Sequence, residues 1–340
     1  MTTTPDGWDH LQRLSDGRGL FEHALGTARR EDHGYCTDDN ARLVVVASRE
    51  PDHRVARQLH AIALDFVFDS FEPNGRCRNR MDRNGKWTDR GSTDDCWGRA
   101  VFALGTTVAG AVATGIAAAD THERALRAFD RALTQRSAWP RAMAFAALGA
   151  ADVLAAIPSH AGAKKLLIDA LNAIGPAPVG GWTWPERRLT YANATLAEAV
   201  LAAGHHLGRE GARDRGLAML SWLLAVETRD GHLSVTGIDG RGPNEAGPQF
   251  DQQPIEVSAL ADACWRASIV TSDPAWGGGV AAAAAWFEGG NDTGAVMHDV
   301  TSGGGYDGLR VDGVNTNQGA ESTLAYVSTM QRARSFATIA

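Results

Sequence analysis

The stretch TDDNAR at residues 37–42 is nearly repeated as TDDCWGR at residues 93–99. Each copy follows a loop that contains glycine and aromatic residues, and each runs into an apolar stretch. A threonine followed by two acids favours a helix start, because the hydroxyl can accept hydrogen bonds from free N–H groups and the carboxylates lie at the positive end of the helix dipole. The repeat therefore predicts two apolar helices that begin in equivalent positions.

Similar starts recur along the chain, and their spacing predicts the fold. Long loops precede the apolar helices, and shorter links lead to more polar helices between them. The six expected starts, 47 to 65 residues apart, are near Asp38, Asp94, Arg141, Tyr191, Glu256 and Glu321. Regular helix pairs of this kind indicate six helical hairpins. We predict an all-α fold, an (α/α)6 toroid with long loops on one face, as a single domain over residues 1–340. An open superhelix of repeats is the alternative architecture.

The composition agrees with a helical core and narrows the classes of partner. Hydrophobic residues make up 44% of the chain, and strand-like alternation is brief. The net charge of −7 argues against a nucleic-acid-binding protein, and no apolar run is long enough for a membrane span or a secretory signal. The four cysteines lie far apart, without the spacing of metal ligands. We therefore expect a cytoplasmic protein with free thiols, no metal and no cofactor.

The acids near the expected helix starts point to cleavage of a glycosidic bond. That reaction needs one carboxyl to protonate the leaving oxygen and a second to activate water or to attack directly. Glu186 follows Trp-Pro in a loop, and burial beside indole would disfavour its charged form, so it is the leading candidate for the proton donor. Glu321 or Glu256 is the expected base, although each can also close a hydrogen-bonded box at its own helix start. The predicted catalytic residues are Glu186, Glu321, Glu256, Asp39 and Asp95.

The substrate is expected to contact aromatic and polar side chains around the same loops. Aromatic rings stack on the apolar faces of sugars, whereas carboxylates, amides and guanidinium groups bind hydroxyls. The two acids of each repeat copy are successive helical residues, so one can face the substrate while the other binds N–H groups or an arginine. The sequence leaves open which acid of each copy does so. The predicted substrate-binding residues are Tyr35, Asp38, Asp94, Trp97, Arg141, Trp182, Trp184, Gln253 and Gln318.

Other common chemistries lack their motifs in this sequence. It contains no phosphate-binding glycine loop with its lysine, no HExxH and no dinucleotide fingerprint. It also contains no GxSxG elbow for a nucleophilic serine. These absences favour an enzyme that depends on carboxyl groups.

Three longer motifs carry a resemblance to a known family. HGYCTDDNAR at 33–42, FDQQPIE at 250–256 and NTNQGAEST at 315–323 resemble signatures of a bacterial group in the six-hairpin glycosidase superfamily. Members of this group are often encoded beside, or fused to, glycosyltransferases. The likeness runs from about Gly19 to Met330. It implies an (α/α)6 barrel, a carbohydrate substrate and a glycosyltransferase as a separate partner chain.

The resemblance leaves the reaction open. The superfamily includes inverting hydrolases, phosphorylases, unsaturated-uronide hydrolases and epimerases, and a fold does not fix which chemistry it hosts. We expect an inverting glycoside hydrolase that acts on an oligosaccharide or glycoconjugate. A phosphorylase or a sugar epimerase is the alternative, as is a non-catalytic glycan-binding partner of a glycosyltransferase. Epimerases on this scaffold tend to use paired histidines on inner helices, and the sequence suggests no such pair.

Overall fold

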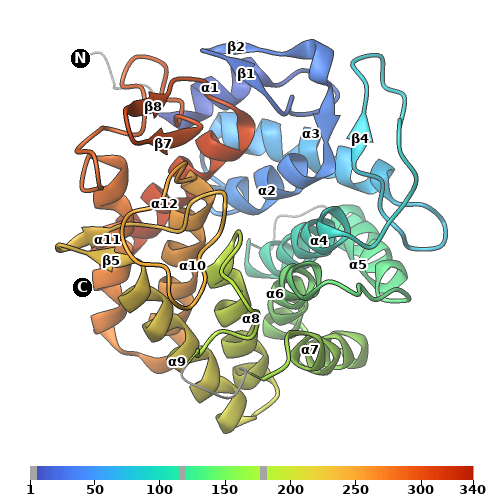
Figure 1. Cartoon of the computed structure of the whole chain (residues 1–340). Coiled ribbons are helices and arrows are strands. Elements are labelled where there is room, and N and C mark those ends of the chain that lie inside the picture. The colour runs from blue at the N-terminus through green and yellow to red at the C-terminus, as the bar shows by residue number, and fades with distance from the viewer. Residues whose placement is uncertain (1–5, 115–118, 177–181, 340) are drawn as a thin grey trace.

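The computed structural model describes residues 6–114, 119–176 and 182–339. Two concentric rings of helices form the molecule, and the colour in Figure 1 runs once around the ring, so that the first and last hairpins meet. The inner helices are α2 (Thr37–Ala47), α4 (Asp95–Thr114), α6 (Pro140–Ala156), α8 (Asn193–His206), α10 (Pro254–Thr271) and α12 (Ala320–Ile339). The outer helices are α1 (Gly7–Leu14), α3 (Arg54–Ser70), α5 (Ala119–Ala132), α7 (Ala161–Ile174), α9 (Glu210–Val226) and α11 (Gly277–Phe287).

The inner ring is closed. Each inner helix contacts the next one in the chain, and α12 contacts α2. The six predicted starts lie within two residues of the observed N-termini of the inner helices. The prediction of an (α/α)6 toroid is therefore confirmed, and the open superhelix is excluded.

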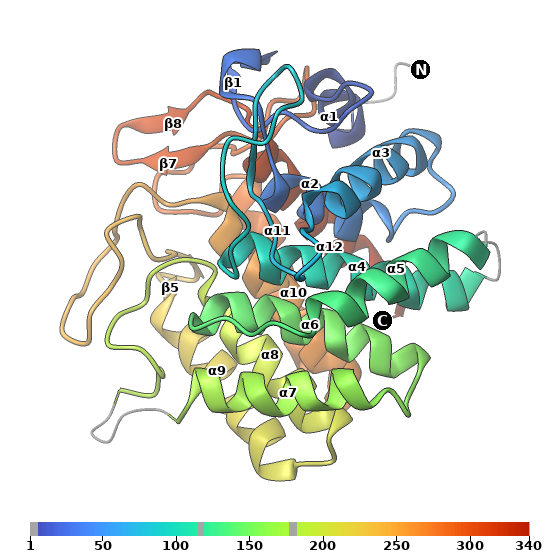
Figure 2. The same cartoon turned by 90° about the vertical axis from the view of Figure 1, so that its right-hand side faces the viewer.

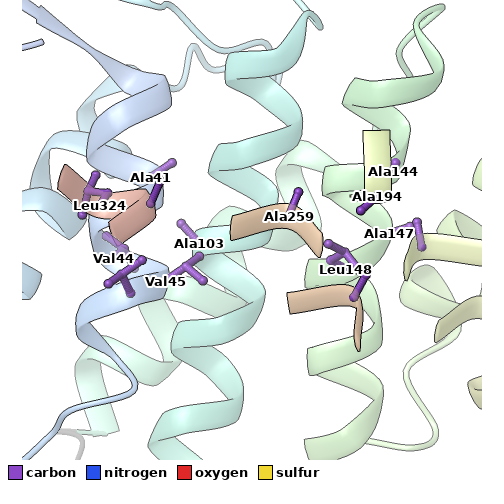
Figure 3. Close-up of a cluster of buried hydrophobic side chains, with 14 of the residues drawn as sticks. Ala41, Val44, Val45, Ala103, Ala144, Ala147, Leu148, Ala194, Ala259 and Leu324 are labelled. Carbon is purple, nitrogen blue, oxygen red and sulfur yellow. The ribbon is translucent and has the colours of Figure 1, made fainter. Parts of the chain in front are cut away.

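Small side chains allow the inner helices to approach closely. Alanine, valine and leucine side chains from all six inner helices are buried along the barrel interior, and Figure 3 shows representatives of each helix, such as Ala103 and Ala147. Between α4 and α6 the approach is closer still, because a Cβ at Gly98 would lie 2.2 Å from the Ala142 carbonyl oxygen. Contacts of this kind need glycine, since protein interiors leave no room for an added carbon.

The loops that precede the inner helices gather on one face of the toroid, where Figure 2 shows β5, β7 and β8; all of them except the loop before α6 are long. In the described parts of these loops there are four two-stranded antiparallel sheets. These are β1 (Ala24–Leu25) with β2 (Ala28–Arg29), β3 (Tyr35–Cys36) with β4 (Arg80–Met81), β5 (Thr228–Arg229) with β6 (His232–Leu233), and β7 (Gly308–Arg310) with β8 (Gly313–Asn315). Two short 3-10 helices are η1 (Glu31–His33) and η2 (Pro274–Trp276). Any site built from these loops therefore lies at the N-terminal ends of the inner helices.

Other expectations were met only in part. All four cysteines are buried and free. Among the described residues, no helix has the length and apolar character needed to cross a membrane. The Thr37 hydroxyl does not cap its helix as the repeat suggested. It donates to the Arg78 carbonyl at 2.7 Å, while the Cys36 sulfur accepts from the Asp39 N–H.

Candidate active site

A polar pocket of about 310 Å³ lies on the loop face beside the N-termini of α2, α10 and α12. Its volume is near the lower end of the range for small-molecule sites, roughly 300–1,000 Å³. Six carboxyl groups line it, namely Glu22, Asp38, Asp39, Asp251, Asp307 and Glu321. Gln253 also lines the pocket, so four of the predicted site residues meet here: Asp38, Asp39, Gln253 and Glu321.

Arg42 is the cation at the centre of this pocket. It forms an ion pair with Asp39 on its own helix and a second one with Glu321 on α12, at 2.5 Å. Asp39 is buried, and the Cys36 thiol donates to its second carboxylate oxygen at 3.1 Å. Burial raises the pKa of Asp39 to about 6, even though Arg42 acts in the opposite direction. Glu321 is the more accessible of the two acids, with 40% of its side chain exposed.

Asp251 faces the same pocket from the loop before α10. One of its carboxylate oxygens is buried and has no hydrogen-bond partner among the described residues, and the other lies 3.5 Å from Arg310 Nε. Burial raises the pKa of Asp251, and Arg310 lowers it by a smaller amount. Gly308 makes this position possible, because a Cβ there would lie 2.1 Å from the unpaired oxygen. Asp251 therefore gives the pocket a second carboxyl, beside Asp39, whose pKa is raised by burial.

A second cavity lies inside the barrel, next to the pocket. Arg42 and Glu321 line both spaces, and Arg99 lines the axial cavity beside them. The Arg99 guanidinium lies 3.8 Å from the centre of the Phe145 ring, and its Nε is 3.4 Å from an Asp38 oxygen. The contact between Arg99 and Asp38 thus links the N-terminal ends of α2 and α4 at the mouth of the barrel.

The acids of the second repeat copy lie outside the pocket and bind aromatic side chains. The Trp139 indole N–H donates to Asp94 at 3.1 Å, and the Tyr191 hydroxyl donates to Asp95 at 2.8 Å. Neither acid lines the pocket or the axial cavity. The predicted catalytic role of Asp95 therefore has no support from its position.

The environment of Glu186 differs from the one predicted for a proton donor. Its carboxylate forms an ion pair with Arg141 at 2.6 Å, and the neighbouring Trp182 indole donates to the Glu186 backbone carbonyl. Arg141 also donates to Asn193 and to the Tyr191 carbonyl. Glu186 thus orients an arginine instead of occupying an apolar wall, and it lies outside the pocket.

Four predicted aromatic contacts are directed elsewhere. Trp97, Trp184 and Tyr35 are almost completely buried, so their faces are not available to a sugar. Tyr35 stacks on Phe21 and donates its hydroxyl to Asp16, and Trp184 stacks on Trp222 of α9. The partly buried Trp182 meets Trp222 edge-on. The loops are rich in aromatic residues, as the sequence shows, but most of these rings pack the loops onto the outer helices.

Glu256 and Gln318 are also structural in this arrangement. Both carboxylate oxygens of the buried Glu256 accept from the N-terminus of α8, from the N–H groups of Ala192 and Asn193, so Glu256 caps a neighbouring helix and not its own. Burial, followed by the nearby Glu227 carboxylate, raises the pKa of Glu256 to about 8. Gln318 is buried between Ser302 and Asp299. Glu256 binds a different hairpin, whereas Gln318 binds its own loop before α12.

Two features of the rim were not expected. His23, which lines the pocket, and His33 have their Nδ1 atoms 3.0 Å apart, so a histidine pair exists on the loops although not on the inner helices. Glu22, Cys36 and Asp39 also bring three metal-ligating atoms within 4.8 Å of one another. Arg80 and Arg42 already pair with the two carboxylates, and burial raises the pKa of the Cys36 thiol. These charges disfavour a divalent cation at this position.

Sequence reasoning missed three lining acids as site residues. Asp251 could have been found, because it belongs to the FDQQPIE motif and directly precedes a helix start. Asp307 follows a glycine-rich stretch, and its carboxylate accepts from Gly319 at the start of α12. Glu22 carries no local signal, since only the fold brings it beside residues 36–42.

Comparisons with known proteins agree on the fold. No family model matches the sequence, and no curated protein matches it either. Among solved structures, a sugar epimerase from a ruminal bacterium is similar, with a TM-score of 0.69 and 13% identity over 97% of this chain and 95% of the other. A cellobiose 2-epimerase from Bacillus thermoamylovorans has a TM-score of 0.69 and 11% identity, covering 97% and 95%. A GH76 α-mannanase from Bacteroides thetaiotaomicron has a TM-score of 0.63 and 10% identity, covering 98% and 94%. The chain therefore shares the (α/α)6 toroid fold of these structures.

Proposed function

We propose that this protein is a carbohydrate-active enzyme and that it hydrolyses a glycosidic bond in the pocket between α2, α10 and α12. The observation that carries the proposal is the convergence of six carboxyls on one pocket, among them one with a raised pKa and an unpaired oxygen, Asp251. The similar structures support a sugar substrate, since their names refer to sugar epimerisation and to mannan cleavage.

In the proposed reaction Asp251 is the general acid and Glu321 is the general base. Asp251 gives its proton to the glycosidic oxygen while the bond from that oxygen to the anomeric carbon breaks. Glu321 takes a proton from a water molecule whose oxygen forms the new bond to the anomeric carbon. Arg42 positions the Glu321 carboxylate through the 2.5 Å ion pair, and the buried Asp39 fixes the other side of the Arg42 guanidinium. Attack by water on the opposite face of the sugar gives inversion at the anomeric carbon.

Epimerisation is the second candidate, and the His23–His33 pair favours it. A neutral imidazole can remove a proton near physiological pH, and its partner can return one. The pair lies at the rim of the same pocket, with 48% of the His23 side chain exposed. The two candidates use different side chains, so they can be separated by mutation.

The test is incubation with cello- and manno-oligosaccharides, with and without phosphate, followed by mass spectrometry and NMR. Hydrolysis gives shorter products that together carry one added water, phosphorolysis gives a sugar phosphate, and epimerisation gives a product of unchanged mass. We expect hydrolysis, with the inverted anomer formed first. Asp251→Asn and Glu321→Gln should each lower the rate by about 10²–10⁴-fold.

The matched control is Asp65→Asn, which changes an exposed carboxylate on the outer helix α3. It should have the activity of the unchanged protein. Full activity in both pocket variants would refute the carboxyl mechanism. An isobaric product that disappears in His23→Ala and His33→Ala would instead establish the epimerase.

A further inference from the structure

Two aromatic side chains on the loop face are exposed to solvent. Trp139 is 61% exposed and Tyr191 is 44% exposed. Among the described residues, the other exposed large hydrophobic side chains are aliphatic. Burying rings of this size is a major source of stability, so exposing them needs another reason.

Both rings are held in place by their polar edges. The Trp139 indole N–H donates to Asp94, and the Tyr191 hydroxyl donates to Asp95. The Arg141 guanidinium lies 4.6 Å from the centre of the Tyr191 ring and is itself fixed by Glu186. Rings fixed in this way lose little side-chain entropy when a ligand binds to their faces.

The two rings adjoin the barrel mouth on the side away from the acidic pocket. Tyr191 directly precedes Ala192, which lines the axial cavity together with Arg99, and Asp95 lies one turn before Arg99 on α4. Arg42 and Glu321 line the same cavity and belong to the pocket on the α2–α12 side. A chain of sugar rings that enters the pocket can therefore continue across the mouth to these aromatic faces.

We propose that Trp139 and Tyr191 form a second sugar-binding subsite, which takes a neutral pyranose ring of an oligosaccharide whose cleaved bond lies in the acidic pocket. This subsite rests on the proposed function and extends it, because it makes the substrate a chain of several sugars. The apolar C–H faces of a pyranose match the exposed rings, and its hydroxyl groups can donate to the Asp94 and Asp95 carboxylates.

The local negative charge and the small exposed area of the two rings argue against other kinds of ligand at this subsite. The two carboxylates beside the rings repel a phosphate or a uronate, so an anionic glycan or a nucleic acid is disfavoured. A stable protein partner needs about 1,000 Å² or more of buried surface, far beyond two separate rings flanked by charges. A neutral glycan meets both constraints.

The test measures binding by titration calorimetry in the Asp251→Asn background, where turnover is suppressed, with neutral cello- and manno-hexaose and the matching disaccharides. Trp139→Ala and Tyr191→Ala should each weaken hexasaccharide binding by about 3- to 10-fold. The effect on the disaccharide should be smaller, so the ratio of the two affinities falls. Trp139→Phe should restore part of the affinity, because a ring face remains.

The control is Ile269→Ala, which removes a side chain that is 57% exposed near the C-terminal end of α10. It should bind both sugars like its parent, and thermal melts should show every variant folded. Equal binding of hexasaccharide by Trp139→Ala, Tyr191→Ala and the parent would overturn the subsite, as would the absence of binding by every neutral hexasaccharide tested or tighter binding of an acidic glycan.

Failure of the subsite and failure of the proposed function give different results. If the chain hydrolyses oligosaccharides but loss of Trp139 changes nothing at any length, the function stands and the subsite is wrong. If no bond is cleaved but neutral hexasaccharides bind in a Trp139-dependent manner, the subsite stands and the hydrolase is wrong.

Discussion

The two copies of the TDD repeat share a sequence but serve different surfaces. In the first copy the acids belong to the polar pocket, where Asp39 pairs with Arg42 on its own helix. In the second copy the acids point to aromatic residues of the following hairpins, Trp139 and Tyr191. One copy therefore builds the proposed reaction site, and the other orients the rings of the proposed subsite.

The difference arises from one position in the alignment of the copies. Arg42 follows Asp39 by three residues, but the equivalent place in the second copy is Gly98, and the arginine comes one residue later as Arg99. A side chain at position 98 is not tolerated, because α4 and α6 touch there. One residue turns a helical side chain by about 100°, so Arg99 faces Phe145 and Asp38 across the barrel mouth. The close packing of α4 on α6 at Gly98 thus explains why Asp39 has an arginine three residues later and Asp95 does not.

Replacing each of the two arginines should give the largest difference in stability between the two copies. Arg42→Met should cost about 3–5 kcal/mol of unfolding free energy, because it leaves the buried Asp39 carboxylate without its cation. Arg99→Met should cost only about 1–2 kcal/mol, since Arg99 stacks on Phe145 and its contact with Asp38 is longer. Urea denaturation of both variants measures the difference. Equal losses would mean that the two ion pairs are equivalent.

The pH dependence of stability should identify Asp39. Burial raises its pKa from the ordinary 3.8 to about 6, so between pH 4 and 6 the folded protein keeps a proton that the unfolded chain has released. Raising the pH through this window therefore favours unfolding. Relative to Asp39→Asn, the unchanged protein should lose stability on the order of 2–3 kcal/mol from pH 4 to 6. Denaturation curves for both proteins at several pH values provide the measurement, and a constant difference between them would contradict the assignment.

Glycine substitution tests the contact between α4 and α6. Gly98→Ala should destabilise the protein by about 1–3 kcal/mol, because the new Cβ meets the backbone of α6 and forces the two helices apart. The control is Gly278→Ala in α11, where an added Cβ meets nothing within 4 Å. That change should stabilise the helix by roughly 0.5–1 kcal/mol. Thermal melts of the pair test the prediction, and similar shifts in both would show that α4 and α6 can separate freely.

The sequence by itself determined the toroid. Loop-led apolar helices alternate with more polar ones at intervals of 47 to 65 residues, and the start signals behind the loops predicted the six inner starts within two residues. It also placed Asp39 and Glu321 on the loop face, because both are at helix N-termini. Such features depend on local propensity and on hydrophobic pattern, which are written along the chain.

Only the tertiary structure decided what each loop residue does. Glu186 was predicted to be a proton donor in a loop and Glu256 a base at a helix start, yet one holds Arg141 and the other caps α8. Trp184 and Trp139 both follow glycine- or serine-containing loops, but Trp184 is buried under Trp222 and Trp139 is exposed. Their partners come from other hairpins, and the charge, burial and direction of a side chain depend on those neighbours. A local pattern cannot contain that information, because it arises only when the six hairpins close into one ring.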